Sequence, residues 1–510
     1  MRAAPLLPVT RREALRMGAA GAAVLGLGGC FGGDEDDPGP ARSRSPARRA
    51  GRLNVVVVVI DNVRADHVGA YGSRDVRTPS LDALAGEGTR FARARPEAFP
   101  TVPARQAILT GRRSFPFEDW EAVSDLPEQP GWSPIPRDRA TFLQTLGVAG
   151  YRTGYVTDNP WVLSPPYRRF RDSVDTFRAV RGQVPAFPPP EGRVSDALLA
   201  RNVVPAQRGT AIEGRTREYL AANLGRRGED DYSTARVFRR ASTWLDRVSG
   251  DGPFALVVDA FGPHEPFDPP PRYLGLYGEN DGRPEPINPF GPPIGEVSEL
   301  GLDEEQLRRV RALYAGEVTF ADAWLGRFLD KLDAAGRAQD TLVMVLSDHG
   351  VLLGEHGYLG KSGSQAYREI IDVPYIVRSP AGPAGSATSD FFASTHDVAP
   401  TVLAALDVDS GQQLDGEDLG PLIAGETGPE RPAFTASYDD SVVAGDGRWL
   451  LISDNQGKQR RLYDDEGDPR EQQDVASKHD DVTDRLWDSV TDAAGGELPR
   501  FGQKGVIEDG

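Results

Sequence analysis

The sequence predicts an α/β fold, in which a large mixed, mostly parallel sheet is flanked by helices and followed by a smaller C-terminal α+β domain. The chain has 510 residues, of which 39% are hydrophobic, and this is enough for one large core with an appendage. Continuous β-branched runs, typical of strands buried on both faces, recur along it. Amphipathic helical patterns lie between these runs, as expected where helices cover both faces of a sheet.

The first thirty residues are expected to be an export signal. Arg11 and Arg12 precede an apolar run at 18–29, which is shorter than the roughly 20 residues that span a bilayer and resembles a twin-arginine signal. Leu27-Gly28-Gly29-Cys30 resembles a bacterial lipobox, in which Cys30 carries the lipid; a plain signal cleaved near Gly29 is the alternative. Residues 31–50 have almost no apolar content and are expected to form a flexible linker.

The catalytic domain is expected to span 51–406 and the small C-terminal domain 407–510, where the strand signals become short. The patterns predict strands at 53–60, 254–258, 341–346 and 375–377, and helices at 234–248 and 303–332. Pro-rich stretches at 184–191, 263–271 and 284–293 are expected to be surface loops that line the rim of a site.

Composition excludes several classes of function. A single cysteine rules out an intramolecular disulfide, a CxxC redox pair and a cysteine-based zinc cluster. The formal net charge is -18, and the basic residues of the globular part are not clustered, which argues against nucleic acid as a partner.

Polar residues follow two of the predicted strands directly. Asp61 and Asn62 come after the first strand, and Asp348 and His349 come after the strand at 341–346. Ligands bind beyond the carboxyl ends of parallel strands. An Asp there is often only a helix cap, but two such ends together predict a site for one divalent cation.

A third segment, 99–112, places Thr101 and Arg105 near a predicted helix start, because Pro103 suits a first helical turn. The Thr101 hydroxyl would then lie where backbone N–H groups favour an anion. A purely capping Thr is the alternative. His264, His356 and Lys361 lie at strand ends or in the loops just after them, where they can add hydrogen-bond donors to the same site.

Seven motifs occur in the order found in sulfatases of the alkaline phosphatase superfamily. They are DNVRADHVGAYG, TVPARQAILTGR, GPHEPF, SDHGVLLGEHGYLGK, HDVAPTVLAAL, LDGEDLGPLI and LYDDEGDPREQQDVA. The chain thus resembles that family from residue 54 to 476. The resemblance implies a mixed sheet flanked by helices, with a short antiparallel sheet beside the site.

The resemblance also implies roles for individual residues. Asp61, Asn62, Asp348 and His349 match the metal ligands of the family. Thr101 takes the nucleophile position and Arg105 the arginine of the C-x-P-x-R signature, while His264 and Lys361 match residues that bind the anionic group and its leaving oxygen. The oxygen-rich ligand set fits Ca²⁺, and His349 equally accepts Mn²⁺ or Zn²⁺.

Two departures from the family pattern bear on the chemistry. Sulfatases use a formylglycine made from Cys or Ser, whereas oxidation of a Thr would give a ketone that hydrates poorly. Where many sulfatases carry a G-K-W-H run, this chain has Asp158 and Pro160. Asp158 or Asn159 could bind a polar or cationic part of the substrate, with His356 as a further candidate, but a structural role for Asp158 and Asn159 is an equal alternative.

These observations predict an exported, metal-dependent hydrolase that attacks a phosphodiester, phosphonate ester or sulfate ester through Thr101. The alternatives are a true sulfuric ester hydrolase of the arylsulfatase type, a phosphoryl-group transferase and a non-catalytic anion-binding lipoprotein. The expected substrate is an anionic small-molecule or glycan ester. The expected location is outside the cytoplasm, with attachment to the membrane only through lipid on Cys30.

Overall fold

The computed structural model describes residues 52–182, 193–248, 252–278, 282–290, 294–382, 385–502 and 504–507. The predicted signal, the linker and Cys30 lie outside the described residues, as does the Pro-rich stretch at 184–191. Within the described part of the chain, no helix is both long and apolar enough to cross a membrane.

The large sheet has eight strands in the order β11-β2-β10-β7-β1-β5-β3-β4. Strands β7, β1, β5, β3 and β4 run parallel, whereas β10 is antiparallel to both of its neighbours. The predicted mixed, mostly parallel sheet is therefore confirmed. Its strands are β1 (Asn54–Ile60), β2 (Thr89–Phe91), β3 (Arg152–Thr157), β4 (Thr176–Ala179), β5 (Phe254–Ala260), β7 (Thr341–Leu346), β10 (Tyr375–Arg378) and β11 (Ala387–Ser389).

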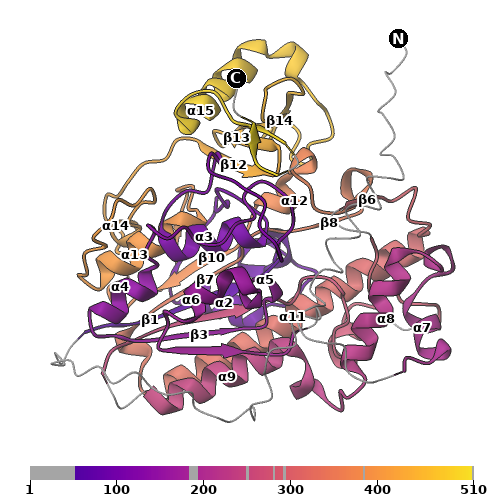
Figure 1. Ribbon diagram of the computed structural model, residues 1–510, viewed down its shortest axis with the longest axis horizontal. Coiled ribbons are helices and arrows are strands. Elements are labelled where there is room, and N and C mark those ends of the chain that lie inside the picture. Colours follow the sequence, from indigo (N-terminus) through magenta and orange to yellow (C-terminus); the bar gives the residue numbers. More distant parts are fainter. Residues whose placement is uncertain are drawn as a thin grey trace.

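Helices cover both faces of this sheet (Figure 1). In β1, Val56 and Val58 join the core formed with α2 (Pro79–Gly86), α9 (Ser233–Val248) and α11 (Glu304–Ala334), whereas Val55 and Val57 join the core formed with α3 (Thr101–Thr110), α4 (Phe142–Val148) and α13 (Val398–Ala405). Side chains of a strand alternate between faces, so a continuous valine run suits a strand that is covered on both sides.

Shorter elements surround the large sheet. A second group of helices, α7 (Asp196–Asn202) and α8 (Ala211–Asn223), lies to one side of it (Figure 1). A small sheet has the order β6-β9-β8. The remaining bounds are α5 (Pro160–Leu163), α6 (Arg168–Arg171), α10 (Pro271–Leu274), β6 (Ile294–Glu296), β8 (Leu352–Leu353), β9 (Tyr358–Gly360), α12 (Arg368–Ile371) and α14 (Gly420–Ile423).

The C-terminal part is built on a four-stranded antiparallel sheet of consecutive strands, β12 (Phe434–Tyr438), β13 (Ser441–Gly445), β14 (Trp449–Asp454) and β15 (Arg461–Asp464). Helix α15 (Asp480–Ala494) packs on it, and β16 (Arg500–Phe501) pairs with β17 (Val506–Ile507). The expected antiparallel α+β portion is present. However, Leu419 and Ile423 still pack into the core of the large sheet, so the antiparallel sheet begins later than residue 407.

Candidate active site

Three neighbouring strands deliver carboxylates to one edge of the large sheet. Asp61 follows β1, Asp348 follows β7, and Asp259 is the penultimate residue of β5. Since β7, β1 and β5 are adjacent and parallel, their carboxyl ends meet at this edge. All three side chains are fully buried. The turn after β1 is held by α11, because the Tyr314 hydroxyl donates to the carbonyl oxygen of Asn62 at 2.8 Å.

The Arg105 guanidinium lies between these carboxylates. Its Nη2 atom is 2.7 Å from Asp259 Oδ1 and 3.1 Å from Asp61 Oδ2, and its Nη1 atom donates to Asp348 Oδ2. Both Nη atoms of Arg105 thus bind carboxylates. Arg105 therefore holds the acidic side chains in place, and three carboxylates against one guanidinium leave a formal charge of minus two.

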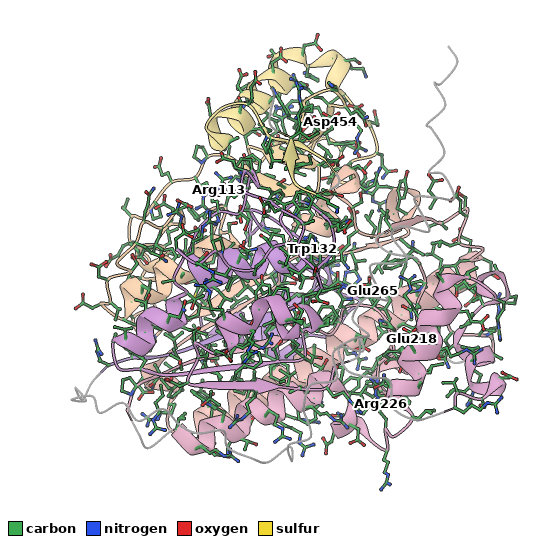
Figure 2. The ribbon with its side chains drawn as sticks, viewed as in Figure 1. Arg113, Trp132, Glu218, Arg226, Glu265 and Asp454 are labelled. Carbon is green, nitrogen blue, oxygen red and sulfur yellow. The ribbon has the colours of Figure 1, made fainter. Side chains whose placement is uncertain are left out.

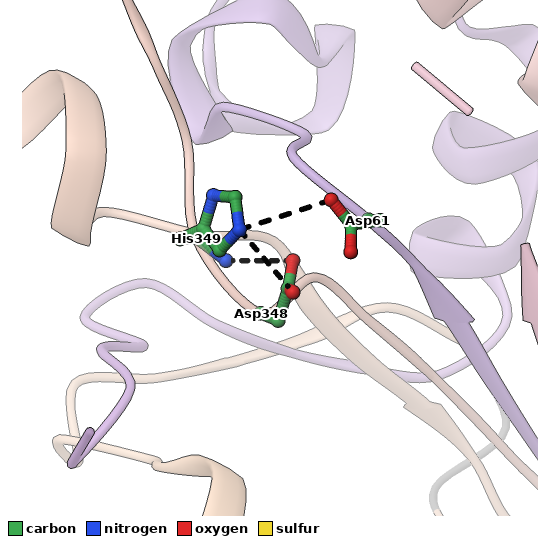
Figure 3. A group of neighbouring side chains, drawn as sticks. All are labelled: Asp61, Asp348 and His349. Atoms are coloured by element: carbon green, nitrogen blue, oxygen red, sulfur yellow. Dashed lines mark hydrogen bonds and ion pairs between the residues drawn. The ribbon is translucent and has the colours of Figure 1, made fainter. Parts of the chain in front are cut away.

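Four buried atoms at this edge that could ligate a metal ion have no hydrogen-bond partner among the described residues: both carboxylate oxygens of Asp61, Asn62 Oδ1 and His349 Nε2. Of these, Asp61 Oδ2 is ion-paired with Arg105. His349 Nε2 lies 3.7 Å from Asp61 Oδ1 and 3.4 Å from Asp348 Oδ2 (Figure 3). Nδ1 of His349 lies 3.0 Å from the Gly350 carbonyl oxygen, and this contact assigns the proton to Nδ1 and leaves the Nε2 lone pair free. Oxygen and imidazole atoms left in this way fit a metal ion.

The pKa shifts at this edge reflect burial and the excess of carboxylates over Arg105. Burial and the neighbouring Asp348 carboxylate raise the pKa of Asp61 well above its ordinary value. For Asp348 the effect of burial is outweighed by Arg105 and by N–H donors, so its pKa is lowered. Burial lowers the pKa of His349 to about 3, which keeps the imidazole neutral. A divalent cation would cancel the remaining charge of the three carboxylates and Arg105.

Thr101 is the first residue of α3, one helical turn before Arg105. Residues four apart share a helix face, so Thr101 faces the same side of α3 as Arg105. The N-cap position belongs to Pro100, and no side chain makes a capping hydrogen bond at this helix start. The capping role that was the alternative for Thr101 is therefore not present in this structure. Thr101 is 1% exposed.

His264 and Lys361 form a second group with Glu265. Lys361 Nζ donates to His264 Nε2 at 3.2 Å and lies 3.4 Å from Glu265 Oε2. His264 Nδ1 is 3.0 Å from the backbone oxygen of Glu265, so we assign the imidazole proton to Nδ1. Burial lowers the pKa of His264 to about 4 despite the opposing effect of Glu265.

The two groups belong to one site. Asn62 Nδ2 donates to the carbonyl oxygen of Pro263 at 3.4 Å, which links the turn after β1 to the loop that carries His264. Lys361 also contributes to the electrostatic environment of Asp61 and His349. The structure thus brings the metal-site residues and the His264–Lys361 pair together.

The three residues predicted as additional substrate contacts have other surroundings. Asp158 accepts a hydrogen bond from the Phe261 N–H at 2.8 Å, and burial raises its pKa to about 6. Asn159 caps α5 by accepting from the N–H groups of Trp161 and Val162. His356 belongs to a separate group with Glu369 and Glu471. The structural role that was the alternative for Asp158 and Asn159 is the one the contacts support, and His356 lies outside the site.

Asp259, Glu265 and Arg215 are further charged residues in or beside the site, and none of them was among the predicted site residues. Asp259 Oδ2 accepts hydrogen bonds from Tyr155 and Thr157 while Oδ1 binds Arg105. Glu265 could have been identified from the sequence, because it directly follows His264. Figure 2 labels it on the side of the sheet where α8 lies, and the Arg215 side chain of α8 is close enough to Glu265 to interact electrostatically. Nε and Nη2 of Arg215 are buried and have no partner among the described residues.

Comparison with known proteins gives a consistent result. The family model described as Sulfatase matches residues 53–408. The multifunctional alkaline phosphatase superfamily protein PehA of Trinickia caryophylli is 30% identical over 414 residues, which are 73% of this chain and 77% of that protein. An arylsulfatase of Clostridium perfringens is 23% identical over 457 residues, covering 82% of this chain and 89% of its own.

Solved structures show the same fold. The phosphonate monoester hydrolase of Agrobacterium radiobacter superposes with a TM-score of 0.64 at 21% identity, covering 90% of this chain and 100% of that chain. The phosphonate monoester hydrolase from Silicibacter pomeroyi has a TM-score of 0.65 at 20% identity, with 90% and 99% covered.

Removal of one ligand tests the metal site. Ca²⁺ added to metal-free protein is expected to raise the melting temperature, because an ion that binds only the folded state stabilises it by about 2.7 kcal/mol at a hundred times its Kd. Asp61→Asn should abolish this rise without lowering the melting temperature of the metal-free protein, since the substitution removes a buried charge. The exposed Asp75→Asn variant is the control and should keep the rise. Equal Ca²⁺-dependent shifts in both variants, measured by calorimetry, would argue against this site.

Proposed function

The chain belongs to the sulfatase family and is a hydrolase of ester bonds, and from this we propose that it cleaves phosphodiesters or phosphonate esters with Thr101 as the nucleophile. The observation that carries the proposal is the position of Thr101 in the first turn of α3, one turn from Arg105, which binds Asp61 and Asp348 of the candidate metal site. Relatives named as phosphonate monoester hydrolases support the choice of substrate class.

The chemistry of a threonine favours phosphorus over sulfur. A formylglycine hydrate attacks sulfur with one hydroxyl and expels sulfate with the other by C–O cleavage. A threonine ester of sulfate has no second hydroxyl and must wait for water to attack the sulfur. A phosphothreonine can be resolved by in-line attack of water at phosphorus. The replacement of the modified residue by Thr therefore shifts the preference from sulfate esters to phosphate and phosphonate esters.

The charge of the site suits a singly charged group. Because Arg105 is bound to carboxylates, the positive charge available to a substrate comes from Lys361 and from a divalent cation at Asp61, Asn62, Asp348 and His349. When bound, such a cation supplies Lewis-acid polarisation of substrate oxygens. We propose Ca²⁺ because oxygen atoms dominate the ligand set. A phosphate monoester dianion is usually held by two metal ions.

The proposed reaction has two displacements. Thr101 Oγ loses its proton and attacks phosphorus, the bond from phosphorus to the leaving oxygen breaks, and the leaving oxygen takes up a proton from Lys361, which is replaced by the proton released from Thr101. Water then attacks the phosphothreonine, the bond from phosphorus to Oγ breaks, and Thr101 regains its proton. Arg105 and Asp259 act as positioning residues, since they hold the first turns of α3 against the strand ends.

The proton for the leaving oxygen comes from the Lys361–His264 pair. His264 carries its proton on Nδ1, so Nε2 can only accept, and it accepts from Lys361. Lys361 Nζ therefore supplies the proton to the leaving oxygen, and His264 holds Lys361 in position by accepting this hydrogen bond. Glu265 stabilises the positive charge that is shared by the two side chains.

Export is a separate proposal. We propose that the twin-arginine-like segment directs the folded protein out of the cytoplasm and that Cys30 anchors it through lipid. The support is the order of Arg11, Arg12, the apolar run at 18–29 and the lipobox-like Leu27-Gly28-Gly29-Cys30.

Three matched substrates test the proposed chemistry. Against an aryl phosphodiester, an aryl phosphate monoester and an aryl sulfate, the metal-loaded protein is expected to show its highest kcat/KM on the diester. Thr101→Ala should reduce that value by roughly 10³-fold or more, as loss of a nucleophile does. Thr101→Ser, which keeps the hydroxyl, should retain most of it. A dominant rate on the sulfate would favour a true sulfatase, and an unchanged Thr101→Ala rate would remove Thr101 as nucleophile.

The pH dependence of kcat/KM tests the state of His264. A pKa of about 4 in the folded protein means that Nε2 stays unprotonated as the pH falls through 6.5. The rate on the diester is therefore expected to stay level from pH 7 to below 6 and to fall only as the pH approaches about 4. Glu265→Gln should move this fall to lower pH, since Glu265 raises the pKa of His264. An acid limb centred near 6.5 would contradict the assignment.

The lipid anchor is tested on protein expressed in a bacterium with lipoprotein processing. The membrane fraction is expected to hold the wild-type chain, with an N-terminal peptide that starts at Cys30 and carries a lipid mass. Cys30→Ala should be released from membranes. Wild-type protein with an N-terminus other than Cys30 and no lipid would support the plain signal peptide instead.

A further inference from the structure

A second group of metal-binding side chains lies away from the active site, where the loop after β7 meets the C-terminal part. We call His356, Glu369 and Glu471 the junction cluster. His356 lies in the short turn before β9, Glu369 in α12, and Glu471 in the segment that follows β15. One ligand atom from each lies within 4.8 Å of the other two.

The atoms that face one another in the junction cluster are unsatisfied. His356 Nε2, Glu369 Oε2 and Glu471 Oε1 are buried and have no hydrogen-bond partner among the described residues. The His356 side chain is 6% exposed, and Glu471 is 2% exposed. A buried polar atom left without a partner costs about 1–3 kcal/mol. Three such atoms pointing at one place therefore indicate a ligand that satisfies them together.

The other atoms of these side chains are already held in place. Glu471 Oε2 accepts the backbone N–H of Arg368 at 3.2 Å, which leaves Oε1 as the free oxygen. The His356 ring stacks on Tyr367 with 3.6 Å between centroids and an angle of 7°. The Tyr367 hydroxyl in turn accepts from Arg461 Nη1 at 2.7 Å. The ligand atoms are therefore oriented before anything binds.

Two of the three residues have an unusual backbone. His356 has φ 54° and Glu471 has φ 49°, both in the left-handed region. This conformation costs a residue other than glycine roughly 1–2 kcal/mol. Strain of this kind persists where the surrounding structure enforces it, often at a binding site.

The two carboxylates of the junction cluster favour a bound cation. Among the described residues, no lysine or arginine forms an ion pair with Glu369 or Glu471. Arg64 and Arg368 are close enough to interact with them electrostatically, but they are paired with Asp66 and Glu355 and with Asp372. Two carboxylates at this place are thus balanced by a divalent ion or by protons.

Distance decides between an ion and a shared proton. His356 Nε2 and Glu369 Oε2 are 3.4 Å apart, which is long for a hydrogen bond between charged groups. Two ligands on a tetrahedral zinc ion with bonds of 2.0–2.1 Å are separated by about 3.3 Å. The observed separation therefore suits two ligands of one ion better than it suits a hydrogen-bonded pair.

We propose that His356, Glu369 and Glu471 bind a divalent transition-metal ion of the Zn²⁺ type, at a site distinct from Asp61, Asp348 and His349. One of three ligands is an imidazole here, against one of four at the first site, and a set of one imidazole and two carboxylates resembles the ligands of Zn²⁺ more than the oxygen-rich sets of Ca²⁺ or Mg²⁺. The ion ties the loop that leads to Lys361 to the C-terminal part of the chain.

Metal counting tests this site without use of activity. The full chain carrying Asp61→Asn, which disables the first site, is freed of metal, dialysed against Zn²⁺ and analysed by elemental mass spectrometry. It is expected to hold one more zinc ion per chain than the same protein with Glu471→Gln added. Glu466→Gln, an exposed neighbour in the same segment, is the control and should leave the count unchanged. Equal counts with and without Glu471→Gln would overturn the proposal.

Cobalt gives a second readout, which also covers the case that Glu471→Gln does not fold. Co²⁺ bound in the Asp61→Asn protein is expected to show visible absorption bands of a site with an imidazole ligand. His356→Gln should remove these bands while circular dichroism shows an intact fold. Bands that persist in folded His356→Gln protein would overturn the assignment of His356 as a ligand.

Discussion

The site depends on one buried guanidinium. Arg105 reaches from α3 to the ends of β7, β1 and β5 and meets a carboxylate at each. A carboxylate in a buried setting is costly unless it is paired, and a buried guanidinium is equally costly alone. The ion pairs therefore fix the position of Arg105 relative to the carboxylates. Because Arg105 belongs to α3, they also fix the position of Thr101 relative to the strand ends. The excess of carboxylates over guanidinium then makes a place for a cation at the same point.

The sequence predicted much of this because strand ends are local signals. Runs of β-branched residues identified β1, β5, β7 and β10, and polar residues directly after β1 and β7 identified Asp61, Asn62, Asp348 and His349. The adjacency of β7 and β1 in the sheet brings those two ends together. The partners of Arg105 could not be predicted, since they depend on the order of strands in space, and Asp259 lies inside a buried strand where only its pairing shows its role.

The residues whose expected roles changed also have non-local partners. Asp158 and Asn159 follow a strand as Asp61 and Asn62 do, but their side-chain oxygens accept hydrogen bonds from the backbone. Asp158 accepts from the N–H of Phe261, just after β5, and Asn159 accepts from N–H groups of α5. His356 lies only five residues before Lys361 in the sequence, but its ring stacks on Tyr367 and its Nε2 turns toward Glu369. In segment 407–433, Leu419 and Ile423 pack into the core of the large sheet, a non-local contact that short strand signals and turn-rich spacing do not reveal.

The C-terminal sheet takes part in positioning the chemistry. Its first strand exchanges backbone hydrogen bonds with the segment before Thr101, since Phe99 donates to Ser437 at 3.0 Å and Ser437 donates to Glu97 at 3.0 Å. It also approaches the loop after Lys361 so closely that a side chain at Gly363 would lie 2.2 Å from the Tyr438 carbonyl oxygen. The same strand thus sets the position of the segments that carry the nucleophile and Lys361. A displacement of this sheet would move both, so the C-terminal part is a structural component of the active site.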